Sequence, residues 1–288
     1  MKKQLIMMTV LAALSGTALA QTVVTVNGTK IDSKEIDSRV AILTKASHNQ
    51  IQDSEPLRKT ITDQIVTRTL LLQAAKKEKL DQNPRYLEIL KQARAQAKKL
   101  GEDKKPDFKT NWADYQDNLL IEAYLSTIVE KNPIKENEIK TTYNDLSNYY
   151  KGTQEIQLGE IMTRDANTAN QAIKELNKKQ DFSTVAKKYT IDPAGREAGG
   201  IPLNYVKLKD LQDGATTVYD AIKNLKTGQY TTTPIAGNNG IYAVFYVHDK
   251  RNVKIPDYAV QKPILKQYLQ DKLIQTTIAK LYQQANIQ

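Results

Sequence analysis

The sequence predicts an α+β fold in which two helical regions flank a central region of strands and short helices. Apolar residues recur at spacings of three and four over residues 55–79, 112–130 and 258–286, which is typical of amphipathic helices. Residues 155–162 alternate as a β-strand does, and residues 241–247 form a short apolar run that predicts a second, central strand. The helical pattern returns after this second strand, so the strands lie between two helical regions of the sequence.

The first twenty residues have the pattern of a secretory signal peptide. Lys2 and Lys3 precede an apolar run over residues 5–14, and Ala18-Leu19-Ala20 offers a cleavage site before Gln21. The apolar run is shorter than the roughly 20 residues that span a bilayer. We therefore expect a chain that is exported and cleaved, with no membrane span in its mature part.

Composition excludes several classes of site. The sequence contains no cysteine, so disulfides and thiolate metal sites are excluded. His48 and His248, the two histidines, lie far apart in the sequence, which leaves little for a histidine metal site or a histidine-dependent triad. No phosphate-binding loop or dinucleotide fingerprint is present, so no cofactor and no metal are expected.

The net charge is +10, or +8 without the two lysines of the leader. The lysines are spread along predicted helices and are not interleaved with aromatic residues in a nucleic-acid-binding motif. We therefore expect no nucleic-acid partner and interpret most lysines as solvated side chains that attract anionic partners weakly.

The mature chain is predicted to begin with a hairpin over residues 21–31, because Asn27-Gly28 is a strong signal for a two-residue turn. Asp32 or Ser33 then caps a first helix. Further helices of the body are predicted over residues 55–79, 85–99, 112–130 and 135–150.

Between its two strands, the central region is predicted to contain short helices over residues 168–178, 181–189 and 219–225. Residues 258–286 form a long amphipathic segment that contains Pro263. Because proline disrupts a helix interior, the regular helix is predicted to begin only at Pro263.

Two patterns resemble known families. The phrase D-F-x-x-V-A-K-K-Y-T-x-D-P over residues 181–193, followed by Gly199-Gly200, resembles the parvulin family of peptidyl-prolyl isomerases. That resemblance continues through Gly228 and Gly240-Ile241 and covers roughly residues 153–250. Near the mature N-terminus, V-x-V-N-G-x-x-I-x-x-x-E-I-D resembles the start of SurA-like and PrsA-like exported chaperones.

The resemblance implies a helical chaperone body, formed by N-terminal helices and a C-terminal helix that packs back on them, with an inserted parvulin-like (FKBP-like βα) domain. The implied divisions are a signal peptide over residues 1–20, an N-terminal domain over 21–151, a parvulin-like domain over 152–251 and the C-terminal helix over 252–288. The implied partners are unfolded or nascent exported polypeptides, outer-membrane proteins among them, and proline-containing peptides, met in the periplasm. A homodimer is left open.

Catalysis of rotation about an X-Pro bond needs no nucleophile and no metal. It needs an apolar pocket for the proline ring, removal of water from the amide, and hydrogen bonds that favour the twisted amide. Parvulins supply two histidines and a Cys or Asp. By resemblance, the histidine positions fall on Glu160 and Tyr242, and the Cys/Asp position on Asp192. These three are the candidate catalytic residues; the candidate substrate-binding residues are Ile201, Val218, Tyr219 and Asn239.

Since both histidine positions are replaced, we expect a folding factor that holds unfolded chains and isomerises proline weakly. Two alternatives remain open from the sequence. One is a fully active isomerase with a site that lacks histidine, and the other is a basic surface adhesin.

Overall fold

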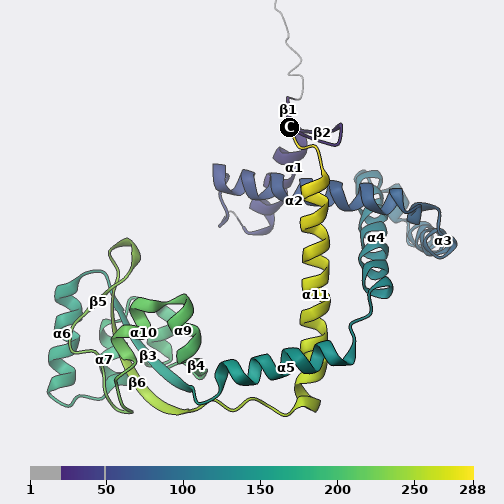
Figure 1. The fold of residues 1–288 in the computed structure, drawn as a ribbon. Helices are drawn as coiled ribbons and strands as arrows, with labels where there is room; N and C mark the ends of the chain where they lie inside the picture. The colour runs from purple at the N-terminus through teal and green to yellow at the C-terminus, as the bar shows by residue number, and fades with distance from the viewer. Residues whose placement is uncertain (1–20, 49) are drawn as a thin grey trace, which may run out of the picture. The chain divides into compact units, whose positions relative to one another are not determined.

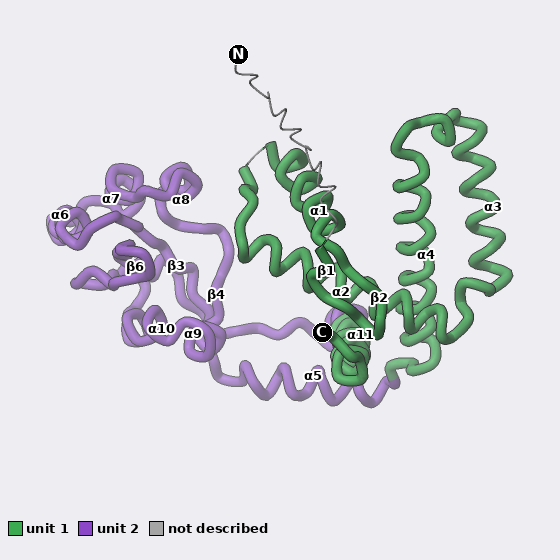
Figure 2. Tube along the Cα trace, turned by 90° about the horizontal axis from the view of Figure 1, so that it is seen from above, with its two compact units in different colours: residues 1–134, 267–288 green, residues 135–266 purple. Residues whose placement is uncertain are grey.

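The structure, a computed structural model, describes residues 21–48 and 50–288, so the predicted signal peptide lies outside the described residues. The chain divides into two compact units (Figure 2). Unit 1 comprises residues 1–134 and 267–288, and unit 2 comprises residues 135–266. Unit 1 is helical apart from one hairpin, whereas unit 2 contains a four-stranded sheet, which confirms the predicted α+β fold class. The domain boundaries expected near residues 151 and 251 remain predictions.

Unit 1 begins with the hairpin of β1 (Thr22–Val26) and β2 (Thr29–Asp32). Asn27 and Gly28 form its turn with φ angles of 49° and 83°, a conformation that Asn and Gly adopt most readily. The carboxylate of Asp32 accepts the Glu35 N–H and caps the next helix. The predicted hairpin, turn and cap are thus confirmed.

The outer edge of β1 pairs with the last residues of the chain (Figure 1). The Thr25 N–H donates to the Gln288 carbonyl at 2.7 Å, and the Gln288 N–H donates back to Thr25 at 3.1 Å. Val26 and Ile287 form the bridge between them. The two ends of the described chain therefore lie side by side and are joined by backbone hydrogen bonds.

The helices of unit 1 bury two neighbouring apolar clusters. They are α1 (Ser33–Ala46), α2 (Glu55–Lys77), α3 (Pro84–Lys99), α4 (Phe108–Lys131) and the C-terminal part of α11 (Tyr258–Gln284), with short 3₁₀ turns at Leu80–Gln82 and Glu102–Lys104. One cluster joins the hairpin to α1 and α2, and the other joins α2 to α3 and α4. Leu281 of α11 packs against both clusters, so α11 connects them.

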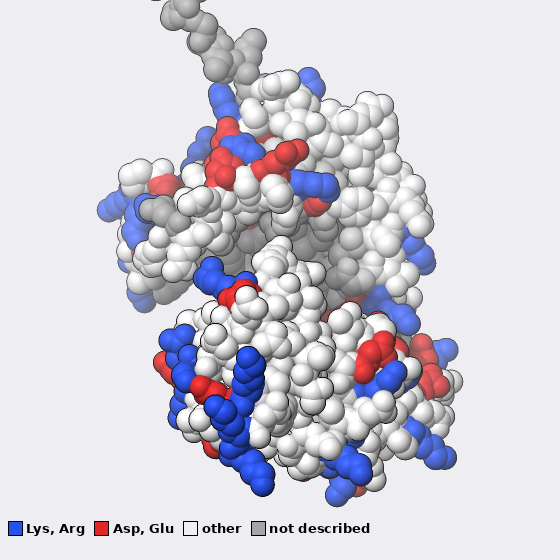
Figure 3. Space-filling view, turned by 90° about the vertical axis from the view of Figure 1, so that its left-hand side faces the viewer, with Lys and Arg blue, Asp and Glu red and all other residues white. Residues whose placement is uncertain are grey.

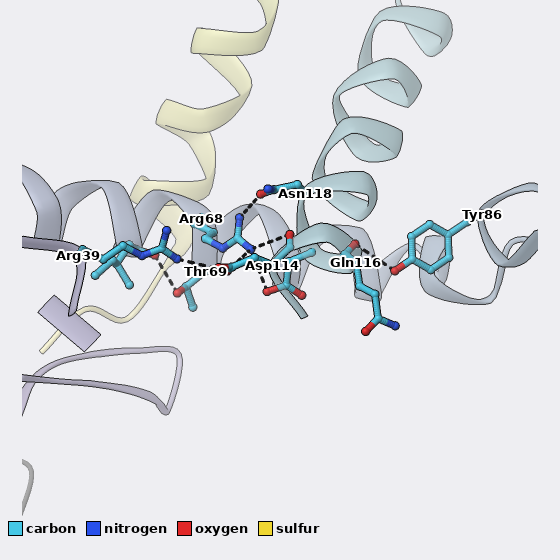
Figure 4. Close-up of polar contacts among 9 residues, drawn as sticks. Arg39, Arg68, Thr69, Tyr86, Asp114, Gln116 and Asn118 are labelled. Atoms are coloured by element: carbon cyan, nitrogen blue, oxygen red, sulfur yellow. Dashed lines mark hydrogen bonds and ion pairs between the residues drawn. The ribbon is translucent and has the colours of Figure 1, made fainter. Parts of the chain in front are cut away.

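A half-buried arginine ties α2 to α4 (Figure 4). The Arg68 guanidinium lies 3.1 Å from the Asp117 carboxylate and 3.4 Å from that of Asp114, and it also donates to the Asn118 side chain. Arg39 of α1 reaches the same Asp114 carboxylate at 3.5 Å. Because one aspartate is shared by arginines from two helices, this network links α1, α2 and α4 within unit 1.

Unit 2 is an antiparallel sheet with helices on both faces. Its strand order is β4 (Val206–Lys207), β3 (Gln154–Thr163), β6 (Tyr242–Asn252) and β5 (Ile235–Ala236). On one face lie α6 (Ala166–Asn177) and α7 (Phe182–Tyr189); on the other lie α9 (Leu208–Gly214) and α10 (Thr216–Ile222). The unit is completed by α5 (Glu136–Tyr150) and α8 (Pro193–Glu197).

Several boundaries differ from the sequence-based expectations, and α4 begins at Phe108, before the predicted residue 112. The helix predicted at residues 219–225 lies at 216–222, and α9 was not predicted. Strand β6 continues to residue 252 because its polar end pairs with residues 154–157 of β3. The expectation that α11 begins only at Pro263 is wrong, since the helix begins at Tyr258.

The first turns of α11 persist because contacts with α5 hold them. The Tyr258 hydroxyl donates to Glu136 at 2.8 Å, and the Lys262 ammonium lies 2.8 Å from the same carboxylate. Pro263 lacks a backbone N–H, so the helix loses one hydrogen bond there, and the contacts with α5 offset this loss. Among the described residues, no helix is both long and apolar enough to cross a membrane.

Candidate functional site

The strand register decides which face of the sheet each predicted site residue occupies. Glu160 of β3 lies opposite Phe245 of β6, and Thr163 lies opposite Tyr242. Side chains alternate along a strand, so Glu160 and Phe245 share one face while Tyr242 projects to the other. The clusters agree, because Phe245 packs on the α9 and α10 side and Tyr242 on the α6 and α7 side. Glu160 and Tyr242 are therefore separated by the sheet.

The segment after α7 runs along the edge of β3 that β4 leaves uncovered. The Ile191 N–H donates to the Met162 carbonyl at 2.9 Å, and the Glu160 N–H donates to the Gly200 carbonyl at 2.7 Å. Between these two attachments, Asp192 caps α8, its carboxylate accepting the Gly195 N–H at 2.7 Å. This path brings the Asp192 carboxylate into the neighbourhood of Glu160.

Glu160 is a half-buried carboxyl group beside a second one. Burial raises its pKa above the ordinary value, and the negative charge of Asp192 raises the pKa further. No cation contributes to the shift. Glu160 therefore holds its proton more tightly than an exposed glutamate does, and when protonated it is a hydrogen-bond donor.

This shift predicts a pH-dependent stability. Because the folded state binds the Glu160 proton more tightly than the unfolded chain, the free energy of unfolding falls as pH rises from about 4.3, the unfolded pKa, through the raised folded pKa. We expect Glu160→Gln to stabilise unit 2 at neutral pH by about 1.4 kcal/mol for each unit of the shift. Urea unfolding followed by circular dichroism at several pH values measures the difference, which should vanish below about pH 4. The matched control is Glu197→Gln, at an exposed glutamate on α8; a gain of equal size in that variant would contradict the assignment.

The predicted substrate-binding residues occupy different surroundings. Val218 packs on the α9 and α10 side, in the cluster that contains Phe245. The Lys223 ammonium lies over the Tyr219 ring, 5.5 Å from the ring centroid. Ile201 packs on the opposite side with Tyr242, and Asn239 is exposed in the turn before β6 with φ 56°. On this geometry Glu160, Asp192, Val218 and Phe245 form the candidate site.

Sequence reasoning missed part of the apolar surface on this face. Phe245 lies directly opposite Glu160, and Leu208 and Leu211 of the unpredicted α9 pack in the same cluster. Two signals were available: Phe245 alternates in phase with Ala243, and the two leucines are spaced as on one face of a helical turn.

Unit 1 contains a groove of its own between α3 and α4. Its volume is about 380 Å³. Tyr86, Ile89, Leu119 and Ala123 supply apolar lining, and Arg85, Glu122 and Glu130 supply charges. Within residues 21–48 and 50–288, no group of three or more His, Cys, Asp or Glu side chains is placed to hold a metal ion.

Comparisons with known proteins match both parts of the chain. Residues 134–262 match the "PPIC-type PPIASE domain" and residues 4–88 the "SurA-like N-terminal domain". The chain is 26% identical to a "Probable parvulin-type peptidyl-prolyl cis-trans isomerase" of Bordetella pertussis, over 99% of this chain and all of that one. It is 28% identical to a "Putative peptidyl-prolyl cis-trans isomerase Cbf2" of Campylobacter jejuni, over 81% and 79% of the two chains. One of the solved structures reported as SurA-like chaperones of Campylobacter jejuni is 25% identical to this chain. The match covers 91% of this chain and 96% of that one, with a TM-score of 0.34. Both resemblances predicted from the sequence are thus confirmed.

Proposed function

Since this chain joins a PPIC-type peptidyl-prolyl isomerase domain to a SurA-like N-terminal domain, we propose that it is a periplasmic folding factor that binds unfolded exported proteins and isomerises proline only weakly. Its substrates on this proposal are unfolded polypeptides, with X-Pro bonds as the reacting groups.

The replacement of both histidine positions is the observation that supports weak isomerisation. Glu160 and Tyr242 stand on opposite faces of the sheet, so they cannot act on one amide as a pair. The candidate site retains an apolar surface at Val218 and Phe245, against which a proline ring can lie. In its protonated form Glu160 offers one hydrogen bond to the peptide. Such a site favours binding of a proline segment over stabilisation of the twisted amide.

The groove between α3 and α4 supports the holding of unfolded chains. Its lining combines apolar side chains with polar ones, and charges of both signs are among the latter. Extended chain segments present apolar and polar side chains at irregular intervals, and a groove with a mixed lining accepts them without a fixed sequence. We propose that this groove binds segments of unfolded polypeptide.

The test measures two activities in one preparation of the mature protein. One assay follows cis–trans isomerisation of a proline tetrapeptide, and the other follows aggregation of an unfolded outer-membrane protein. We expect aggregation to be suppressed while isomerisation is at least about 100-fold slower than with a parvulin that has both histidines, the typical effect of losing one transition-state donor. Isomerisation at the parvulin's rate would overturn the proposal in favour of a fully active enzyme. Failure to suppress aggregation would overturn the holding function and favour the adhesin alternative.

Matched variants separate the two sites. Asp192→Asn removes the charge but keeps a residue that caps helices well, and Asp181→Asn does the same at the cap of α7. Residual isomerisation should change with the first variant and not with the second. Ser126→Trp should fill the α3–α4 groove and weaken suppression of aggregation, whereas Ala113→Trp, on an exposed position of the same helix that does not line the groove, should not.

A further inference from the structure

Unit 2 carries a concentration of positive charge on the helices that cover the sheet face opposite Glu160. Helices α6 and α7 pack against each other there, and their exposed surface carries five lysines and no arginine. These residues, called here the lysine face, are Lys174, Lys178, Lys179, Lys187 and Lys188. Figure 3 views the side of the molecule that carries α6 and shows basic side chains gathered on it with few acidic ones between them.

Nearby acidic groups neutralise the lysine face only in part. Glu175 lies 2.5 Å from the Lys188 ammonium, and it also accepts a hydrogen bond from the Tyr189 hydroxyl at 2.9 Å. Lys188 and then Tyr189 lower the pKa of Glu175 most, with Lys178 contributing as well. The carboxylate of Asp181 caps α7 and accepts from Thr184. The five lysines thus outnumber these two carboxylates, both of which are already engaged.

One of the lysines occupies a backbone position that costs free energy. Lys179 follows the C-terminus of α6 with φ 64°, in the left-handed region where glycine or asparagine is usual. A side chain other than these costs roughly 1–2 kcal/mol in that conformation. Lys79 after α2 has the same left-handed conformation, so this strain is not particular to the lysine face.

We propose that the lysine face binds the anionic headgroups of a lipid bilayer. Lysine ammonium groups are compact point charges on flexible stems, whereas phosphate-specific pockets favour the planar fork of arginine. Clusters of four to eight basic side chains bind anionic bilayers through the summed attraction of many headgroups. The candidate site lies on the other face of the same sheet, so a bilayer at the lysine face leaves Glu160 accessible to a peptide.

The experiment measures co-sedimentation of the mature protein with vesicles of phosphatidylcholine, with and without phosphatidylglycerol. We expect binding to the anionic vesicles only, and a steep loss of binding as salt is added. Lys174→Gln with Lys187→Gln should weaken binding roughly 25-fold, about five-fold per lysine. The matched control is Lys140→Gln with Lys254→Gln, which removes the same charge from exposed positions elsewhere in unit 2.

Three results would overturn the proposal. Equal binding to neutral vesicles would mean that charge is not responsible. Equal weakening in the control pair would mean that net charge acts and not the lysine face. Binding to polyglutamate as tight as to the anionic vesicles would assign the face to acidic polypeptides. Circular dichroism of both variant pairs checks that the fold is retained.

Discussion

Replacing Gly200 by alanine is expected to destabilise unit 2 by about 2–5 kcal/mol. Gly200 has φ 74°, a backbone conformation that side-chain-bearing residues adopt at a cost. A Cβ atom there would stand 2.8 Å from the Glu160 carbonyl oxygen and 2.6 Å from the Ala186 Cβ. Neither neighbour can retreat easily, because β3 is a central strand and Ala186 is fully buried. The backbone strain and the steric overpacking therefore both contribute to the loss of stability.

Gly228→Ala separates these two effects. Gly228 also has a positive φ, 85°, but no atom lies within 4 Å of the position of its added Cβ. This control should cost only the backbone strain, roughly 1–2 kcal/mol. Hydrogen exchange of the β3 and β6 amides measures the loss locally, and these amides should exchange faster in Gly200→Ala than in Gly228→Ala. Equal exchange in the two variants would show that the contacts around Gly200 are unimportant.

Replacing Leu281 by aspartate is expected to destabilise unit 1 by about 3 kcal/mol. Leu281 is the α11 residue that packs against both apolar clusters of the unit. The substitution removes an apolar side chain from both contacts and puts a charge between them. We therefore expect α11 to detach from α2 and the β1 edge to lose its C-terminal partner.

Trp112 reports this loss, because it is the only tryptophan and packs against the same cluster as Leu281. The urea midpoint of its fluorescence transition should fall in Leu281→Asp. Ala279→Asp places the same charge on an exposed position of the same helix and should leave the midpoint nearly unchanged. If both variants shift the midpoint equally, the effect comes from helix propensity and not from the contacts of Leu281.

Local signals were sufficient to predict most of unit 1. Asn27-Gly28 dictates a tight turn by its backbone preferences alone, and Asp32 caps α1 through a side-chain contact three residues away. The long helices follow from apolar spacing, since one face of each is buried. Pro263 misled the prediction because its effect depends on Glu136, a partner more than a hundred residues away in the chain.

The candidate site was harder to predict, because it depends on strand register. The motifs placed Glu160 and Tyr242 on paired strands, but the face that each occupies is decided by the residue opposite to it. The same limit applies to Ile201, whose side depends on how the chain after α8 returns along β3. Helix α9 was missed because its seven residues offer only one pair of leucines at helical spacing, Leu208 and Leu211, which is a weak signal by itself.

On the proposed function, which places this protein in the periplasm, the pairing of β1 with residues 286–288 has a consequence for the order of folding events. Thr25 and its partner Gln288 are 263 positions apart in the chain. A chain that crosses a membrane from its N-terminus exposes β1 long before its partner strand arrives, whereas residues 135–266 of unit 2 are contiguous and need not wait. During that interval an unpaired strand edge is open to any neighbouring chain. Export from the N-terminus, as the proposed function requires, would therefore leave the first strand of this protein unpaired until residues 286–288 arrive.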